Sequence, residues 1–131
     1  MVQKIKNTQN YNVLSAIFAC LLWGSWSFYI NAESGFNVGL IAAITQGVSS
    51  FLITLFMTYL IEKQFNAYPK KWAKLFAPPI CTVLFTGTCL VLAHFIMNTP
   101  NIIKTVTPAL CVATIFAFFT NFKLYRQMKH L

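Results

Sequence analysis

Of the 131 residues in the sequence, 57% are hydrophobic and only 9% are charged. Because about a quarter of the residues in a typical soluble domain are charged, this composition excludes a water-soluble fold. The formal net charge is +8, but the basic residues lie between and outside long apolar segments. Anionic lipid headgroups are therefore the expected partner of this charge, and nucleic acid is not.

Four apolar segments follow one another along the chain, and each is long enough to cross a bilayer. The first ends in Trp26, Phe28 and Tyr29, aromatic residues that are typical of the membrane interface. The sequence thus predicts an all-α membrane protein, with a single integral membrane domain of four transmembrane helices in two helical hairpins. The predicted spans cover residues 12–30, 38–61, 76–97 and 105–125.

Residues 62–75 form the longest connection, between the second and third spans. Phe65, Tyr68 and Trp72 recur in it at intervals of three and four, with lysines between them. This spacing is typical of a cytoplasmic segment that lies in the membrane interface, with aromatic rings toward lipid and lysines toward phosphates. Pro69 predicts a break in the segment rather than one continuous helix.

The second span has no charged residue over its 24 positions, and small residues recur in it every four positions. Small residues recur in the same way in the fourth span. Residues four apart share one helix face, and small side chains allow two helices in lipid to approach closely. We therefore expect spans two and four to be buried by these small faces. The predicted helix-packing residues are Gly39, Ala43, Gly47, Ala109, Ala113 and Ala117.

The basic residues predict the orientation in the membrane. Nine of the ten Lys and Arg residues lie in the N-terminal arm, in the 62–75 connection or at the C-terminal end. Positive residues stay on the cytoplasmic side, so we expect both termini and this connection to be cytoplasmic. The small chain shows no eukaryotic targeting signal, and we expect it in a bacterial inner membrane.

A shift of 66 residues aligns the first predicted hairpin with the second, and the pattern T-x-F-x-x-Y-x-x-x-K then recurs, beginning at Thr54 and at Thr120. A true duplication would relate the two hairpins by a parallel pseudo-two-fold axis along the membrane normal. Chance similarity between apolar helices explains the same matches, and the two interpretations stay open.

No span carries Asp, Glu, Lys or Arg in its middle, where proton- and ion-coupled transporters place an ionisable residue. The sequence also lacks paired carboxylates, zinc motifs, nucleophile elbows and glycine-rich phosphate loops, and its four cysteines have no metal-type spacing. We therefore predict no enzyme activity, no catalytic residue, no metal and no cofactor.

Polar side chains within or near the spans are the remaining candidates for a site. Gln46 and His94 either hold helices together or line a polar pocket on the external side, with Glu33 and Asn98 nearby. Basic residues near the cytoplasmic interface, together with one amide, either contact lipid headgroups or only set the orientation. These candidate headgroup contacts are Lys70, Lys71, Lys74, Asn121, Lys123 and Arg126.

The run TNFKLYR at residues 120–126 combines amide, aromatic and basic side chains at the end of the fourth span. With four short spans and two cytoplasmic termini, it resembles the GtrA-like membrane proteins, in which spans two and four each end in such a cluster. The resemblance implies a role in moving polyprenyl-phosphate-linked sugars. The matching run at residues 54–59, TLFMTY, lacks the Asn and the basic residue.

Leu22-Trp23-Gly24 is similar to a motif of the drug/metabolite transporter group, which includes the small multidrug resistance exporters. Those exporters depend on a membrane-embedded Glu in span one, and this chain has none there. We therefore disfavour membership of that family.

The sequence favours a non-enzymatic accessory protein that binds, or helps translocate, a lipid or a polyprenyl-phosphate-linked substrate. One alternative is a small oligomeric transporter or channel of the drug/metabolite type, with a pore lined by Gln46, Ser50 and Thr54. Another is a structural subunit of a larger membrane complex. The expected partners are membrane lipids, preferentially anionic ones on the cytoplasmic side, and either a second copy of the chain or another membrane protein.

Overall fold

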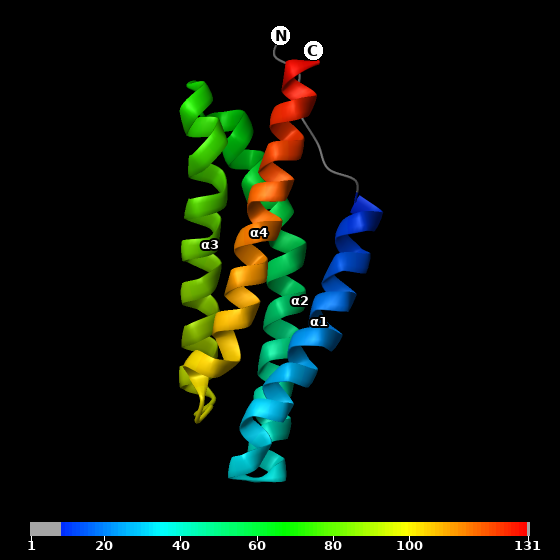
Figure 1. Cartoon of the computed structure of the whole chain (residues 1–131), viewed down its shortest axis with the longest axis vertical. Helices are drawn as coiled ribbons and strands as arrows, with labels where there is room; N and C mark the ends of the chain where they lie inside the picture. Colours follow the sequence, from blue (N-terminus) through cyan, green and yellow to red (C-terminus); the bar gives the residue numbers. More distant parts are fainter. Residues whose placement is uncertain (1–8, 131) are drawn as a thin grey trace.

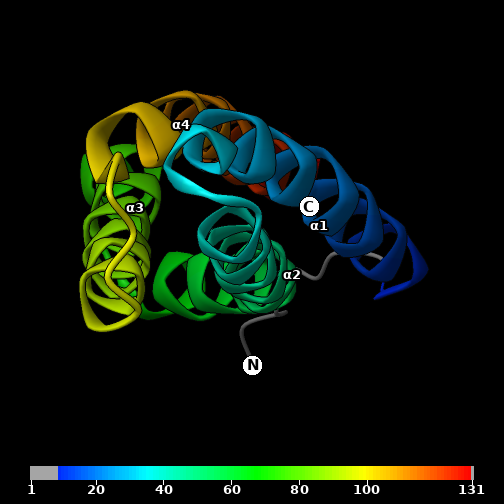
Figure 2. The same ribbon diagram turned by 90° about the horizontal axis from the view of Figure 1, so that it is seen from below.

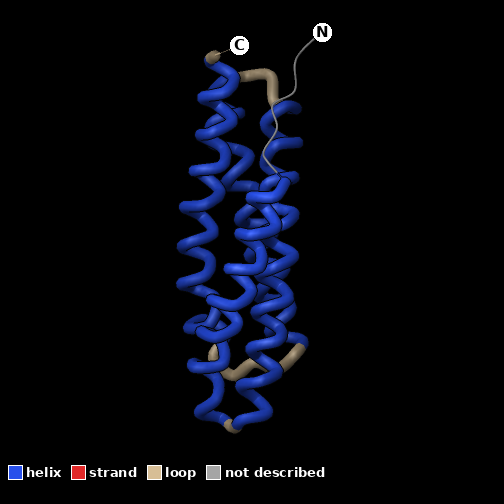
Figure 3. The backbone as a smooth tube through the Cα atoms, turned by 90° about the vertical axis from the view of Figure 1, so that its right-hand side faces the viewer, coloured by secondary structure: helices blue, strands red, loops and turns tan. Residues whose placement is uncertain are grey.

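The structure is a computed structural model that describes residues 9–130, with the side chains of residues 13–130. The described residues form helices and short connections without a strand (Figure 3). Each of the four α-helices is long and apolar enough to cross a membrane. This confirms the predicted all-α membrane fold with four transmembrane helices. The elements are α1 (Gln9–Asn31), a 3-10 turn η1 (Ala32–Ser34), α2 (Phe36–Ala67), α3 (Lys71–Ile96) and α4 (Ile102–Lys129).

The four helices form an up-and-down bundle (Figure 1). We call the end with the start of α1 and the end of α4 the termini end, and the opposite end, with η1 and residues 97–101, the turn end. Helix α2 packs against each of the other three helices, whereas α1 and α3 make no close backbone contact within the described residues. Helices α1 and α4 diverge toward the termini end (Figures 1 and 2).

The structure divides the predicted 62–75 connection between two helices. Helix α2 continues to Ala67 and α3 begins at Lys71, so only residues 68–70 lie outside them. Tyr68 has an extended backbone with φ −77° and ψ 131°, as expected for a residue that precedes proline. Pro69 therefore breaks the segment as predicted, and the residues on either side of it extend α2 and α3.

Two prolines inside α3 free backbone carbonyls that a neighbouring helix satisfies. Pro78 and Pro79 lack the N–H groups that would bond to the carbonyls of Lys74 and Leu75, four residues earlier. The Asn121 side chain of α4 donates from Nδ2 to both carbonyl oxygens, at 2.9 and 2.7 Å. In lipid, where no water replaces a lost bond, this contact makes the two prolines tolerable and ties α4 to α3.

Helix α4 shows the same arrangement near its start. Pro108 cannot bond to the carbonyl of Lys104, and the indole Nε1 of Trp26 in α1 donates to that oxygen at 3.1 Å. A side chain from another helix thus caps the carbonyl that each helical proline frees.

The small residues of α2 lie against α1. A Cβ atom added to Gly47 would lie 3.3 Å from Cys20 Sγ, and one added to Gly24 would lie 3.3 Å from the Ala43 carbonyl oxygen. Gly39 packs against the turn η1 that follows α1, and there the added atom would lie only 2.8 Å from Ala32 Cα, closer than real Cβ contacts. Glycine is therefore what allows the two backbones to come this close.

The small residues of α4 have different neighbours. Ala117 is fully buried in a core cluster with Met57, Ile61, Phe65 and Leu124, which joins α2 to α4 at the termini half of the bundle. Ala109 is buried and Ala113 is half-buried, and both border a cavity described below.

The two halves of the chain share local geometry. Helices α2 and α4 begin 66 residues apart. Lys63 Nζ lies 5.8 Å from the centre of the Tyr59 ring, and Lys129 Nζ lies 5.2 Å from that of Tyr125, the equivalent pair. The tight glycine contact of α2 has no counterpart on α4, and the pseudo-two-fold repeat stays a prediction.

Candidate functional site

Gln46 and His94 form a buried polar contact between α2 and α3. His94 Nε2 lies 2.5 Å from Gln46 Oε1, and His94 Nδ1 lies 2.7 Å from Thr99 Oγ1. Gln46 and His94 are 0% exposed, and Thr99 is buried as well. The Nε2 group of Gln46 has no hydrogen-bond partner among the described residues. The three side chains fix α2 to the turn that follows α3.

The other two residues of the predicted polar pocket lie elsewhere on the surface. Glu33 and Asn98 are exposed, and Asn98 occupies a turn with φ 58°. The structure therefore brings Gln46 and His94 together as a buried contact and leaves Glu33 and Asn98 outside it.

Asn31 is the centre of another buried contact at the turn end. It is 0% exposed and donates to Thr105 Oγ1 and to the Ser27 carbonyl oxygen, both at 2.8 Å. Its Oδ1 accepts from the Asn101 backbone N–H at 3.1 Å. These bonds hold α1 against the start of α4. Its place at the end of an apolar span, before the sequence AES, resembles a surface turn and gives no sign of burial.

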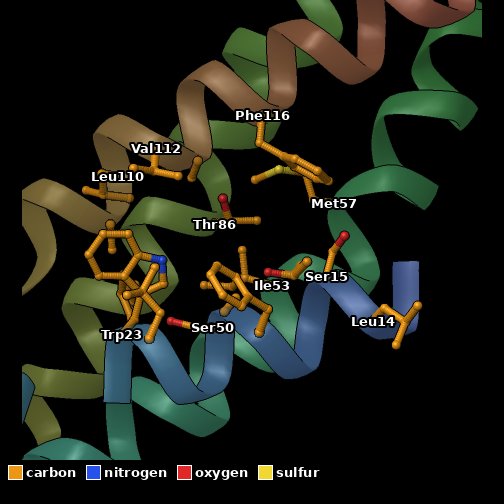
Figure 4. Close-up of a pocket in the computed structure, with 17 residues that line it drawn as sticks. Leu14, Ser15, Trp23, Ser50, Ile53, Met57, Thr86, Leu110, Val112 and Phe116 are labelled. Carbon is orange, nitrogen blue, oxygen red and sulfur yellow. The ribbon is translucent and has the colours of Figure 1, made fainter. Parts of the chain in front are cut away.

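A cavity of about 450 Å³ lies in the middle of the bundle, where α1 and α4 diverge (Figure 4). Its volume falls within the usual range of small-molecule sites, roughly 300–1,000 Å³. All four helices contribute to its wall, which contains no charged residue. The lining residues are Leu14, Ser15, Phe18, Ala19, Leu22, Trp23, Ser50, Ile53, Thr54, Met57, Thr86, Leu90, Ala109, Leu110, Val112, Ala113 and Phe116.

The cavity opens between α1 and α4 toward the side of the bundle. Leu14 and Phe18 on α1 line it and are 68% and 67% exposed, and Val112 on α4 lines it and is 47% exposed. These large apolar side chains therefore border both the cavity and the outside of the bundle.

Two of the six candidate headgroup residues make contacts within the bundle. Asn121 is 1% exposed and gives its amide hydrogens to α3. Lys74 donates to the Phe65 carbonyl oxygen in the last turn of α2, four residues before Pro69, and its Nζ lies 4.9 Å from the centre of the Phe65 ring. This lysine caps the C-terminus of α2, where a cation is favourable.

The other four candidate headgroup residues lie at the termini end. Lys70, Lys71 and Arg126 are exposed, and Lys123 is half-buried. Within residues 9–130, no group of three or more His, Cys, Asp or Glu side chains is placed to hold a metal ion.

No protein-family model, curated protein or solved structure matches the chain. The resemblance to GtrA-like proteins therefore stays a prediction from the sequence.

Proposed function

We propose that this protein binds a lipid or a lipid-linked substrate, with the apolar chain of that molecule in the cavity between α1 and α4. It acts as a non-enzymatic accessory factor that holds the molecule or helps it cross the membrane. The observation that carries the proposal is the apolar, uncharged cavity in the middle of the bundle, open to the side.

The physical chemistry of the opening supports a lipid. An acyl or isoprenoid chain enters between Phe18 and Val112 directly from the bilayer, without crossing water. A chain that leaves lipid for the cavity gains no hydrophobic free energy, because both surroundings are apolar. Its affinity therefore depends on close packing against the wall and on any polar contact inside it.

The exposed basic residues at the termini end support a headgroup near that surface. Each Lys or Arg near an anionic leaflet contributes about 1 kcal/mol of attraction. Lys70, Lys71 and Arg126 favour an anionic headgroup, such as the phosphate of a polyprenyl-phosphate lipid, on this side. By the same charge bias we propose that the termini end is cytoplasmic and that the membrane is a bacterial inner membrane.

Filling the cavity tests the proposal. Ala113→Phe places a ring where Ala113 lines the wall. Ile115→Phe is the matched control, because Ile115 lies two residues away on α4, is 71% exposed and does not line the cavity. We expect native mass spectrometry of the purified protein to show co-purified lipid on the unchanged protein and on Ile115→Phe, and at least several-fold less on Ala113→Phe.

The melting temperatures of both variants in detergent show whether each is folded. Equal lipid retention by two folded variants would contradict the proposal.

A further inference from the structure

The cavity contains a hydroxyl group that the protein leaves without a partner. Ser50 lines the cavity, lies near the middle of α2 and is 7% exposed. Within the described residues, its hydroxyl donates to no acceptor. Ser50 is 14 positions from the start of α2, or about 21 Å along the axis at 1.5 Å per residue. This depth places the hydroxyl in the apolar interior of a bilayer, where water does not replace the missing bond.

Other hydroxyls in these helices show what Ser50 lacks. A Ser or Thr side chain within an apolar helix usually donates to the backbone carbonyl four residues earlier. Thr45, Thr88 and Thr114 do so, at 2.7–2.8 Å. Thr86, which also lines the cavity, bonds to the Thr82 carbonyl oxygen at 2.8 Å. Ser50 departs from this rule and faces the cavity instead.

Two neighbours on the same face of α2 have the same deficit. Thr54, one turn toward the termini end, lines the cavity, and its hydroxyl makes no hydrogen bond to any residue the structure describes. Gln46, one turn toward the turn end, is fully buried with an unpartnered Nε2 group. An amide Nε2 is only a donor, and the two hydroxyls each have a hydrogen to donate. Ser50 and Thr54 thus present unused donors along one side of a mostly apolar cavity, and Gln46 lies buried beyond its wall.

We propose that Ser50 and Thr54 donate hydrogen bonds to an uncharged acceptor oxygen on the apolar part of the bound lipid, such as a carbonyl away from the headgroup. This inference rests on the proposed lipid-binding function and names the chemistry that the cavity selects. An acceptor complements unused donors, and a neutral one fits because no charged residue lines the wall and a charge at this depth is costly. The site thereby favours apolar chains that carry such an oxygen over purely hydrocarbon chains.

Two radiolabelled probes of matched chain length separate the ester contact from chain packing: methyl palmitate, which has an ester carbonyl, and hexadecane, which does not. Equilibrium binding of each probe to the purified full chain in detergent gives an apparent Kd. We expect Ser50→Ala to bind methyl palmitate roughly 2- to 10-fold more weakly, the usual value of one hydrogen bond, and hexadecane equally well.

Ser49→Ala is the matched control, because Ser49 is the next residue, is half-buried and does not line the cavity. It should change neither affinity. Thr54→Val, which keeps the side-chain shape and removes the other hydroxyl, should repeat the selective loss of methyl palmitate binding.

The outcomes distinguish this inference from the proposed function. If Ala113→Phe weakens both probes while Ser50→Ala and Thr54→Val change neither, the cavity binds chains but selects no acceptor, and the inference is wrong. A Ser50→Ala variant that weakens both probes equally also contradicts it, since the hydroxyl would then act through packing. If Ala113→Phe affects neither probe, the proposed function itself fails.

Discussion

The side-chain amide of Asn121 donates to the backbone carbonyl of Lys74, the acceptor that Pro78 leaves free in α3. A residue of α4 thereby completes the hydrogen bonding of a helix whose own sequence cannot do so. Trp26 does the same for Lys104 in α4. Because an unsatisfied carbonyl in lipid is costly, these contacts convert helix-breaking prolines into fixed points between helices.

Replacing Asn121 with Leu keeps the branched shape of the side chain but removes both donors. We expect this variant to lower the free energy of unfolding by about 1–3 kcal/mol, since two buried carbonyls lose their partner. Thermal unfolding in detergent compares the stability of this variant with that of the unchanged protein. The control restores the missing N–H groups: Pro78→Ala and Pro79→Ala, added to Asn121→Leu, should recover part of the loss. No recovery would mean that Asn121 stabilises the bundle through some other contact.

The buried contact between Gln46 and His94 predicts energetic coupling. Gln46→Leu or His94→Leu alone should destabilise the protein, because each leaves the other side chain buried with one partner fewer. In the double variant, the free energy of unfolding should fall by less than the sum of the two single losses. The difference should be about 0.6 kcal/mol and at most about 1.7 kcal/mol, the range for polar pairs between membrane helices. Strict additivity in a double-mutant cycle would contradict a direct bond.

The contact between α1 and α2 predicts that substitutions at two neighbouring positions of α2 differ in their effect on stability. Gly47→Leu places a branched side chain against Cys20, where an added Cβ already lies 3.3 Å from the sulfur, and should cost about 1–3 kcal/mol. Val48→Leu is the control, because Val48 is 53% exposed on the outer face. Equal melting temperatures for the two variants in detergent would indicate that Gly47 faces lipid rather than α1.

Cysteine labelling tests the proposed orientation. A membrane-impermeant maleimide should reach a cysteine at position 33 only from outside, and cysteines at 63, 71 and 129 only from the cytoplasm. All four positions are exposed, so access depends on the side of the membrane and not on burial. A variant without the native cysteines provides the background. Labelling of position 33 from the cytoplasm would show that the protein has the opposite orientation.

The sequence predicts the four helices because a run of about 20 apolar residues has few alternatives. The predicted second span ends at Ile61, before the first charged residue, whereas α2 continues to Ala67 and stops at the break that Pro69 predicts. The sequence also places Asn121 in a basic cluster. Periodicity along α4 alone does not show that the carbonyls of Lys74 and Leu75 in α3 accept hydrogen bonds from it. The cavity depends on the angle between α1 and α4, which no local pattern encodes.

The most direct test of lipid binding is an experimentally determined structure of the protein in native lipid. Our account predicts continuous density for an apolar chain between Trp23 and Phe116, leaving the bundle between α1 and α4, with an acceptor oxygen beside Ser50. Helices α1 and α4 closed against each other around an empty interior, with ordered lipid only on other faces, would contradict it.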